Sequence, residues 1–65
     1  MIQVNDEPLD FEPGITVADV LKKRGFVSRM LAVWVDGDLV PRDGYEMTAI
    51  PDGASVTIVL MIAGG

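Results

Sequence analysis

The chain has 65 residues, enough for one domain with a small core. With no cysteine and no histidine, it cannot be held together by disulfides, and a zinc site is nearly excluded. Ten acidic residues against five basic ones give a net charge of −5, which argues against nucleic acid or an anionic membrane surface as a partner.

The first part of the chain predicts a β-hairpin. Residues 2–4 alternate between apolar and polar side chains, residues 5–8 are typical of a turn, and residues 9–12 alternate again. The alternation places four apolar side chains on one buried face: Ile2, Val4, Leu9 and Phe11. Pro13-Gly14 ends the hairpin.

A short helix is predicted next, because Val17, Val20 and Leu21 are three and four positions apart and form one apolar stripe. Thr16 is placed to be the N-cap, and Asp19 replaces the usual glutamate of a capping box. A helix of about eight residues does not persist alone, so we expect it to lie on the sheet.

The end of this helix is also encoded locally. Gly25 is placed to be the left-handed residue just past the helix, and Phe26 can then pack back on Leu21. The basic cluster of residues 22–24 suits a helix C-terminus, where cations complement the helix dipole. A nucleic-acid patch is the alternative interpretation, and the acidic total argues against it.

The second half predicts three strands separated by turns. The strands are expected at residues 31–35, 39–40 and 56–62. Asp36-Gly37 is typical of a tight hairpin turn, and Pro41 stops the returning strand. Residues 42–51 look irregular, and Asp52-Gly53 is another turn. The last strand is almost continuously apolar, which is typical of a strand inside a sheet.

The order β-β-α-β-β-β, with an interior last strand, predicts an α+β fold. If the last strand lies parallel to the first, the result is a mixed sheet with one short helix packed on one face, a β-grasp. Periodicity alone leaves other α+β arrangements open. We expect a single domain over residues 1–65, with a flexible Gly-Gly tail at residues 62–65.

Few side chains are suited to catalysis. Ser28 and Ser55 have no base beside them, and the two lysines are adjacent on the helix end. The acidic pairs Asp6-Glu7 and Asp36/Asp38 flank turns, where such residues cap and hydrogen-bond the backbone. No spacing of glycines matches a phosphate-binding loop. We therefore expect no enzyme activity, no catalytic residue, no metal and no cofactor bound by this chain.

The last two residues, Gly64-Gly65, are the unusual chemical feature. Glycine has no Cβ, so a Gly-Gly tail can lie extended in a narrow channel, and its terminal carbonyl is open to attack. A carboxylate becomes a good electrophile once its oxygen is made a leaving group, for instance by adenylation. The alternative interpretation is an ordinary loose terminus.

The compartment is expected to be the cytoplasm. Charged residues follow Met1 too closely for a secretory signal peptide. The apolar run of residues 56–63 is too short for a membrane helix, which needs about 20 apolar residues.

The whole chain resembles the ThiS family, the sulfur carriers of thiamine biosynthesis in the ubiquitin-like β-grasp superfamily. The resemblance rests on the order and spacing of several segments. These are "IQVNDEP", "TVADVLK", "AVWVDGDLVPR" followed by Tyr45, "PDG" before the last strand, and the final "IAGG". Ala54 and the bulky Trp34 depart from the family pattern.

The resemblance implies roles for the tail. Gly65 would carry the adenylate and then the thiocarboxylate, and Gly64, with Ala63 and Ile62, would be recognised in the activating enzyme's channel. That enzyme would be an adenylyltransferase of the ubiquitin-activating type (ThiF-like), which uses ATP and Mg. The sulfur would pass to a thiazole synthase (ThiG-like) for the thiazole ring of thiamine.

Two other functions remain open from the sequence. One is the same thiocarboxylate chemistry in another pathway, such as molybdopterin or cysteine synthesis. The other is a ubiquitin-like modifier or interaction module whose tail carries no sulfur.

A partner-binding face is predicted from strand alternation. If Val33 faces the helix, Trp34 faces away from it, near Val59 and Met61 of the last strand, while Leu60 packs inward. We predict that Trp34, Val59 and Met61 contact a partner. The alternative interpretation is that Trp34 covers the edge of the sheet or joins two copies of the chain.

Overall fold

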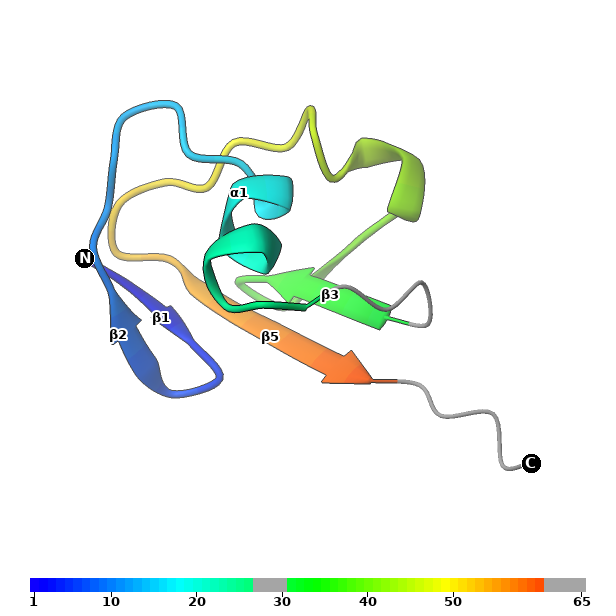
Figure 1. The fold of residues 1–65 in the computed structure, drawn as a ribbon, viewed down its shortest axis with the longest axis horizontal. Helices are drawn as coiled ribbons and strands as arrows, with labels where there is room; N and C mark the ends of the chain where they lie inside the picture. The colour runs from blue at the N-terminus through cyan, green and yellow to red at the C-terminus, as the bar shows by residue number, and fades with distance from the viewer. Residues whose placement is uncertain (27–30, 61–65) are drawn as a thin grey trace.

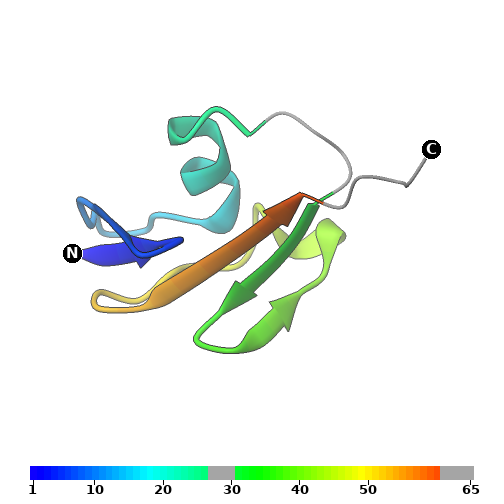
Figure 2. The ribbon, with the colours of Figure 1, turned by 90° about the horizontal axis from the view of Figure 1, so that it is seen from below.

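The computed structural model describes residues 1–26 and 31–60, and these residues form a mixed sheet with one α-helix. The elements are β1 (Ile2–Val4), β2 (Glu7–Leu9), α1 (Val17–Lys23), β3 (Leu31–Val35), β4 (Asp38–Val40), the 3-10 turn η1 (Arg42–Gly44) and β5 (Ser55–Leu60). The strand order is β2-β1-β5-β3-β4, and β5 is parallel to β1 and antiparallel to β3. Helix α1 lies on one face of the sheet (Figures 1 and 2). The predicted α+β β-grasp arrangement is confirmed.

The core lies between α1 and the sheet. Its most deeply buried side chains come from β1, α1, β3 and β5, and they are Ile2, Val4, Val17, Val20, Val33 and Val56. Leu9 and Phe11, which were expected on the buried face of the first hairpin, are half-buried and pack against the edge of this core. The packing therefore places β5 in the middle of the sheet, as its apolar sequence predicts.

The first hairpin is tighter than predicted. The expected second strand at residues 9–12 is wrong, because β2 runs from Glu7 to Leu9. The turn is Asn5-Asp6 alone, with φ of 50° and 66°, as a two-residue turn between twisted strands requires. Pro8, taken as a turn residue, lies in β2 opposite Gln3. A proline is tolerated there because β2 is an edge strand.

The predicted helix ends are confirmed. The hydroxyl oxygen of Thr16 accepts from the Asp19 N–H, and the Asp19 carboxylate accepts from the Thr16 N–H, which completes the capping box. Gly25 is left-handed, with φ of 76°. The N–H of Phe26 then donates to the Leu21 carbonyl at 2.9 Å, and Phe26 packs half-buried against the core.

The segment after β4 is less irregular than predicted. It contains η1 and then returns beside the helix, where the Ala18 N–H donates to the Tyr45 carbonyl and the Ile50 N–H donates to the Ile15 carbonyl. Ile50 is buried. No helix among the residues that the structure describes is long and apolar enough to cross a membrane.

Candidate functional site

The strand that leads to the Gly-Gly end is the centre of the candidate site. β5 was expected at residues 56–62, and its described part runs from Ser55 to Leu60. The predicted tail residues Ile62, Ala63, Gly64 and Gly65 lie outside the described residues, as does Met61. Figure 1 shows the end of β5 on the far side of the molecule from the N-terminus. The residues that follow Leu60 in the sequence therefore begin at this end of the sheet.

The two edges of β5 are held differently. β3 pairs with it over five positions, from Val35 opposite Val56 to Leu31 opposite Leu60. β1 pairs only with its first two residues, Ser55 and Val56. Beyond them, the side chain of Asn5 bonds to Ile58: its oxygen accepts from the Ile58 N–H at 2.8 Å, and its NH₂ donates to the Ile58 carbonyl at 3.2 Å. The sequence pattern predicts only a turn at Asn5.

The sheet face opposite α1 carries a group of apolar side chains, which we name the outer patch: Trp34, Leu39 and Val59. Trp34 lies directly opposite Leu39 of β4 and Thr57 of β5, and Val59 lies two pairs further along, opposite Ala32. Val33, Val56 and Ile58 are buried on the other face. The facing of Trp34 and Val59 agrees with the predicted alternation, and their role in binding stays a prediction.

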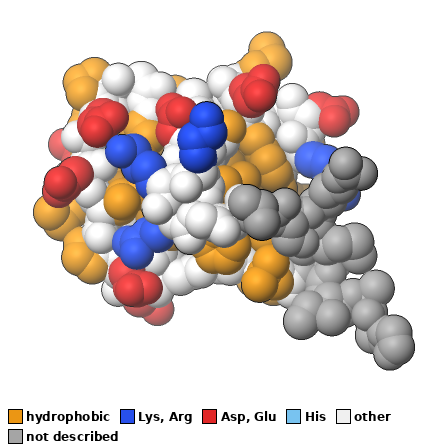
Figure 3. Space-filling model, in the orientation of Figure 1, with side chains coloured by type: hydrophobic (Ala, Val, Ile, Leu, Met, Phe, Trp, Pro, Cys, Tyr) orange, Lys and Arg blue, Asp and Glu red, His pale blue; other side chains and the backbone are white. Residues whose placement is uncertain are grey.

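The outer patch is open to solvent. Leu39 is 63 % exposed, Val59 is 44 % exposed, and Trp34 is half-buried. Leu39 was not predicted as part of this face, because its position depends on the Asp36-Gly37 turn, which places it opposite Trp34. On the helix-bearing face in Figure 3, by contrast, charged side chains are interspersed among the apolar ones. Contiguous exposed apolar surface is typical of a binding site.

The expectation that Leu60 packs inward is wrong. Leu60 lies on the helix side of the sheet, but 49 % of it is exposed. Figure 2 shows that α1 lies away from the described end of β5. The described end of β5 therefore projects beyond the cover that α1 provides.

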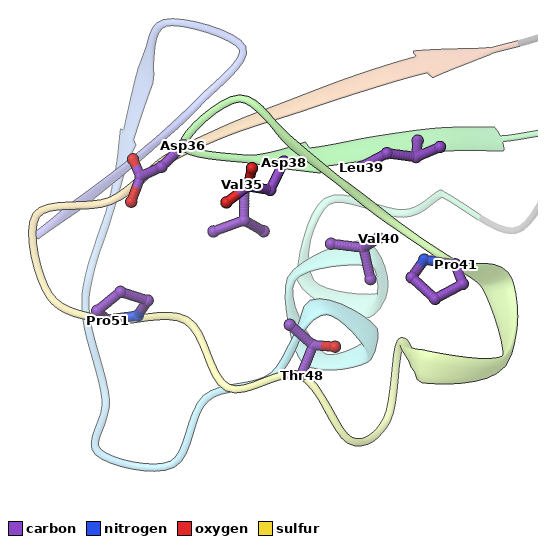
Figure 4. Close-up of a pocket in the computed structure, with 8 residues that line it drawn as sticks. All are labelled: Val35, Asp36, Asp38, Leu39, Val40, Pro41, Thr48 and Pro51. Carbon is purple, nitrogen blue, oxygen red and sulfur yellow. The ribbon is translucent and has the colours of Figure 1, made fainter.

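A hollow of about 370 Å³ lies between the β3–β4 hairpin and the chain near Pro51. Figure 4 shows Val35, Val40 and Thr48 around it. Two of its polar side chains are used by the fold: the Asp36 carboxylate accepts from the Ser55 N–H at 2.9 Å, and the Thr48 hydroxyl donates to the Gly44 carbonyl at 2.7 Å. Residues 1–26 and 31–60 contain no cluster of acidic side chains suited to a metal ion.

Two residues of the basic cluster at the end of α1, Lys23 and Arg24, have structural partners. Lys23 Nζ lies 3.5 Å from a Glu12 carboxylate oxygen, and Arg24 donates to the Pro8 carbonyl at 3.0 Å. The pKa of Asp19 lies below its ordinary value, first because the N–H and hydroxyl of Thr16 donate to its carboxylate, and second because lysines lie nearby. These contacts favour the interpretation of the basic cluster as a helix end.

Comparison with known proteins gives the family. The sequence matches the ThiS family over residues 2–65. A thiazole synthase from Paramagnetospirillum magneticum is 36 % identical over 62 residues, which cover 95 % of this chain and 19 % of the relative. The chain thus spans about a fifth of that protein's length.

Two solved structures share the fold. The crystal structure of a thiamine biosynthesis protein (ThiS) from Geobacter metallireducens has a TM-score of 0.78 at 21 % identity, covering 98 % of this chain and 97 % of that one. An NMR structure of a thiamine biosynthesis protein from the same organism has a TM-score of 0.71 at 22 % identity, covering 98 % and 86 %. Because the family match extends over almost the whole sequence, the chain belongs to the ThiS family.

Proposed function

We propose that this chain is a sulfur carrier of thiamine biosynthesis and that Gly65 carries the sulfur as a thiocarboxylate. The observation that carries the proposal is the ThiS family match, which includes Gly64 and Gly65. The position of β5 supports it, since this central strand leads directly to those residues. In this role the chain is a co-substrate that other enzymes modify.

The chemistry proceeds in two steps at the α-carboxylate of Gly65. A carboxylate oxygen attacks the α-phosphorus of ATP, and pyrophosphate leaves. A hydrosulfide equivalent then attacks the acyl carbon, a C–S bond forms, and AMP leaves with the original oxygen. ATP and Mg belong to the activating enzyme. The sulfur must come from outside, because this chain contains no cysteine.

The acceptor that we propose is a thiazole synthase. Support comes from the Paramagnetospirillum magneticum relative, which carries the name thiazole synthase and contains a region similar to this chain within one longer protein. A carrier region and a synthase in one polypeptide indicate that the two act together. We propose that the outer patch contacts the activating enzyme or the synthase while the tail enters the active site.

The test is ATP–pyrophosphate exchange with the activating enzyme. Deleting Gly65, or adding one residue after it, is expected to abolish exchange, because either change moves the reacting carboxylate. A thermal melt of each variant is expected to match the parent, because the last core residue in the described part of the chain is Ile58. Normal exchange by the deletion variant would falsify the proposal.

A further inference from the structure

The Asn5 side chain imitates a strand residue. Its carboxamide makes both hydrogen bonds that a peptide group would make to Ile58, one as acceptor at 2.8 Å and one as donor at 3.2 Å. The backbone N–H of Asn5 donates to the Val56 carbonyl at 2.9 Å, one step earlier on the same edge. Asn5 therefore extends the β1–β5 ladder by one step after the chain of β1 has turned away.

This extension matters because of where β5 leads. Without it, the edge of β5 facing β1 would be paired only as far as Val56, and the second half of the strand would be held from the β3 side alone. Ile58 is 6 % exposed, so its N–H and carbonyl would lose their partners in a largely dry environment. We name these two hydrogen bonds between Asn5 and Ile58 the clamp. The residues after Leu60 begin three positions beyond Ile58.

The turn itself does not require this side chain. Asn5 and Asp6 are both left-handed, with φ of 50° and 66°, and glycine adopts such angles without strain. Both positions belong to the same turn, but the hydrogen bonds to β5 come from Asn5. Removing each side chain in turn therefore separates the clamp from the turn.

We propose that Asn5 is a positioning residue that fixes the C-terminal half of β5 and so sets where the tail leaves the sheet. Its effect on sulfur loading rests on the proposed function, whereas its effect on β5 does not. A held strand presents the tail to the activating enzyme with less freedom to lose on binding. The expected kinetic signature is a raised KM for the carrier with little change in kcat.

The experiment compares Asn5→Gly with the matched control Asp6→Gly. Both keep a left-handed turn residue and remove a side chain, but only the first removes the clamp. Amide hydrogen exchange of Ile58 is followed by NMR, with the Val33 amide of β3 as an internal reference. Asn5→Gly is expected to speed Ile58 exchange about tenfold, as loss of about one net hydrogen bond implies, with Val33 unchanged.

The same variants are assayed by ATP–pyrophosphate exchange. Asn5→Gly is expected to raise the carrier's KM about fivefold, since part of the same free energy is lost in ordering the tail, and Asp6→Gly is expected to leave it unchanged. Asn5→Asp keeps the acceptor for the Ile58 N–H and should protect that amide better than Asn5→Gly.

Three outcomes would overturn the inference. Unchanged Ile58 exchange in Asn5→Gly would mean that the clamp does not hold β5. Equal acceleration at Ile58 and Val33 would mean general destabilisation, and an unchanged KM would mean that the clamp does not position the tail. If the parent chain is not adenylated, the proposed function fails. The amide hydrogen exchange of Ile58 in Asn5→Gly and Asp6→Gly still decides whether the clamp holds β5.

Discussion

Replacing Trp34 with alanine separates binding from folding at the outer patch. The ring lies half-buried on the face opposite α1, between Leu39 and Thr57 on the neighbouring strands. Cross-strand contacts of this kind contribute about 0.2–1 kcal/mol each, so we expect Trp34→Ala to lower the free energy of unfolding by about 1 kcal/mol. If Trp34 is a hot spot, the change weakens partner binding by about 2 kcal/mol or more, which is about 30-fold in Kd.

Val33→Ala is the matched control from the adjacent position. Val33 is fully buried, facing α1, and does not reach the outer face. Losing its two methyl groups costs about 2 kcal/mol in unfolding free energy through lost burial and a small cavity. Affinity measured well below the melting transition is expected to be unchanged. Trp34→Ala is thus expected to lower affinity more than stability, whereas Val33→Ala is expected to lower stability and leave affinity unchanged.

The assays are calorimetric titration with the activating enzyme and with the thiazole synthase, and denaturant unfolding of each variant. Sedimentation of the free protein tests the alternative that Trp34 joins two copies. Unchanged affinity together with a collapsed unfolding midpoint for Trp34→Ala would refute the assignment of the outer patch. Loss of a dimer on substitution would favour the self-association interpretation instead.

Two further predictions concern the helix ends. The pKa of Asp19 is lower in the folded chain than in the unfolded chain, so the unfolded chain binds this proton more readily. The contribution of Asp19 to the free energy of unfolding is therefore present above pH about 4, and it is lost as the pH falls through the pKa of the folded state. Asp19→Asn should therefore flatten the acid dependence of the urea midpoint, and parallel curves for variant and parent would contradict this. Gly25→Ala should lower the free energy of unfolding by about 1–2 kcal/mol, because the backbone φ of 76° is strained for alanine. Backbone strain is the whole expected effect, since an added Cβ meets no atom within 4 Å. Equal unfolding free energies for glycine and alanine would show that the backbone relaxes.

Local chemistry made much of the fold predictable. Thr16, Asp19 and Gly25 define the helix ends through bonds within a few residues, and the apolar run of β5 indicates a central strand. Pro8 was predicted in the turn because proline is common in turns. Its actual position in the edge strand β2 follows from the sheet order, which the local sequence does not indicate.

The candidate site was predictable where it depended on alternation and not where it depended on distant contacts. The facing of Trp34 follows from the two-residue period of a strand. The position of Leu39 depends on the register of β3 and β4, and the exposure of Leu60 depends on how far α1 reaches. The contact between Asn5 and Ile58 joins residues 53 positions apart, which no local pattern indicates.

The most direct test of the central claim is intact-protein mass spectrometry after incubation with the activating enzyme, ATP and a sulfur source. The account predicts a mass gain equal to the replacement of one oxygen by one sulfur, located on the peptide that contains Gly64 and Gly65. The gain should disappear when ATP is omitted and in the variant that lacks Gly65. Unmodified protein under all conditions, or lysine-linked conjugates with no sulfur-bearing form, would contradict it.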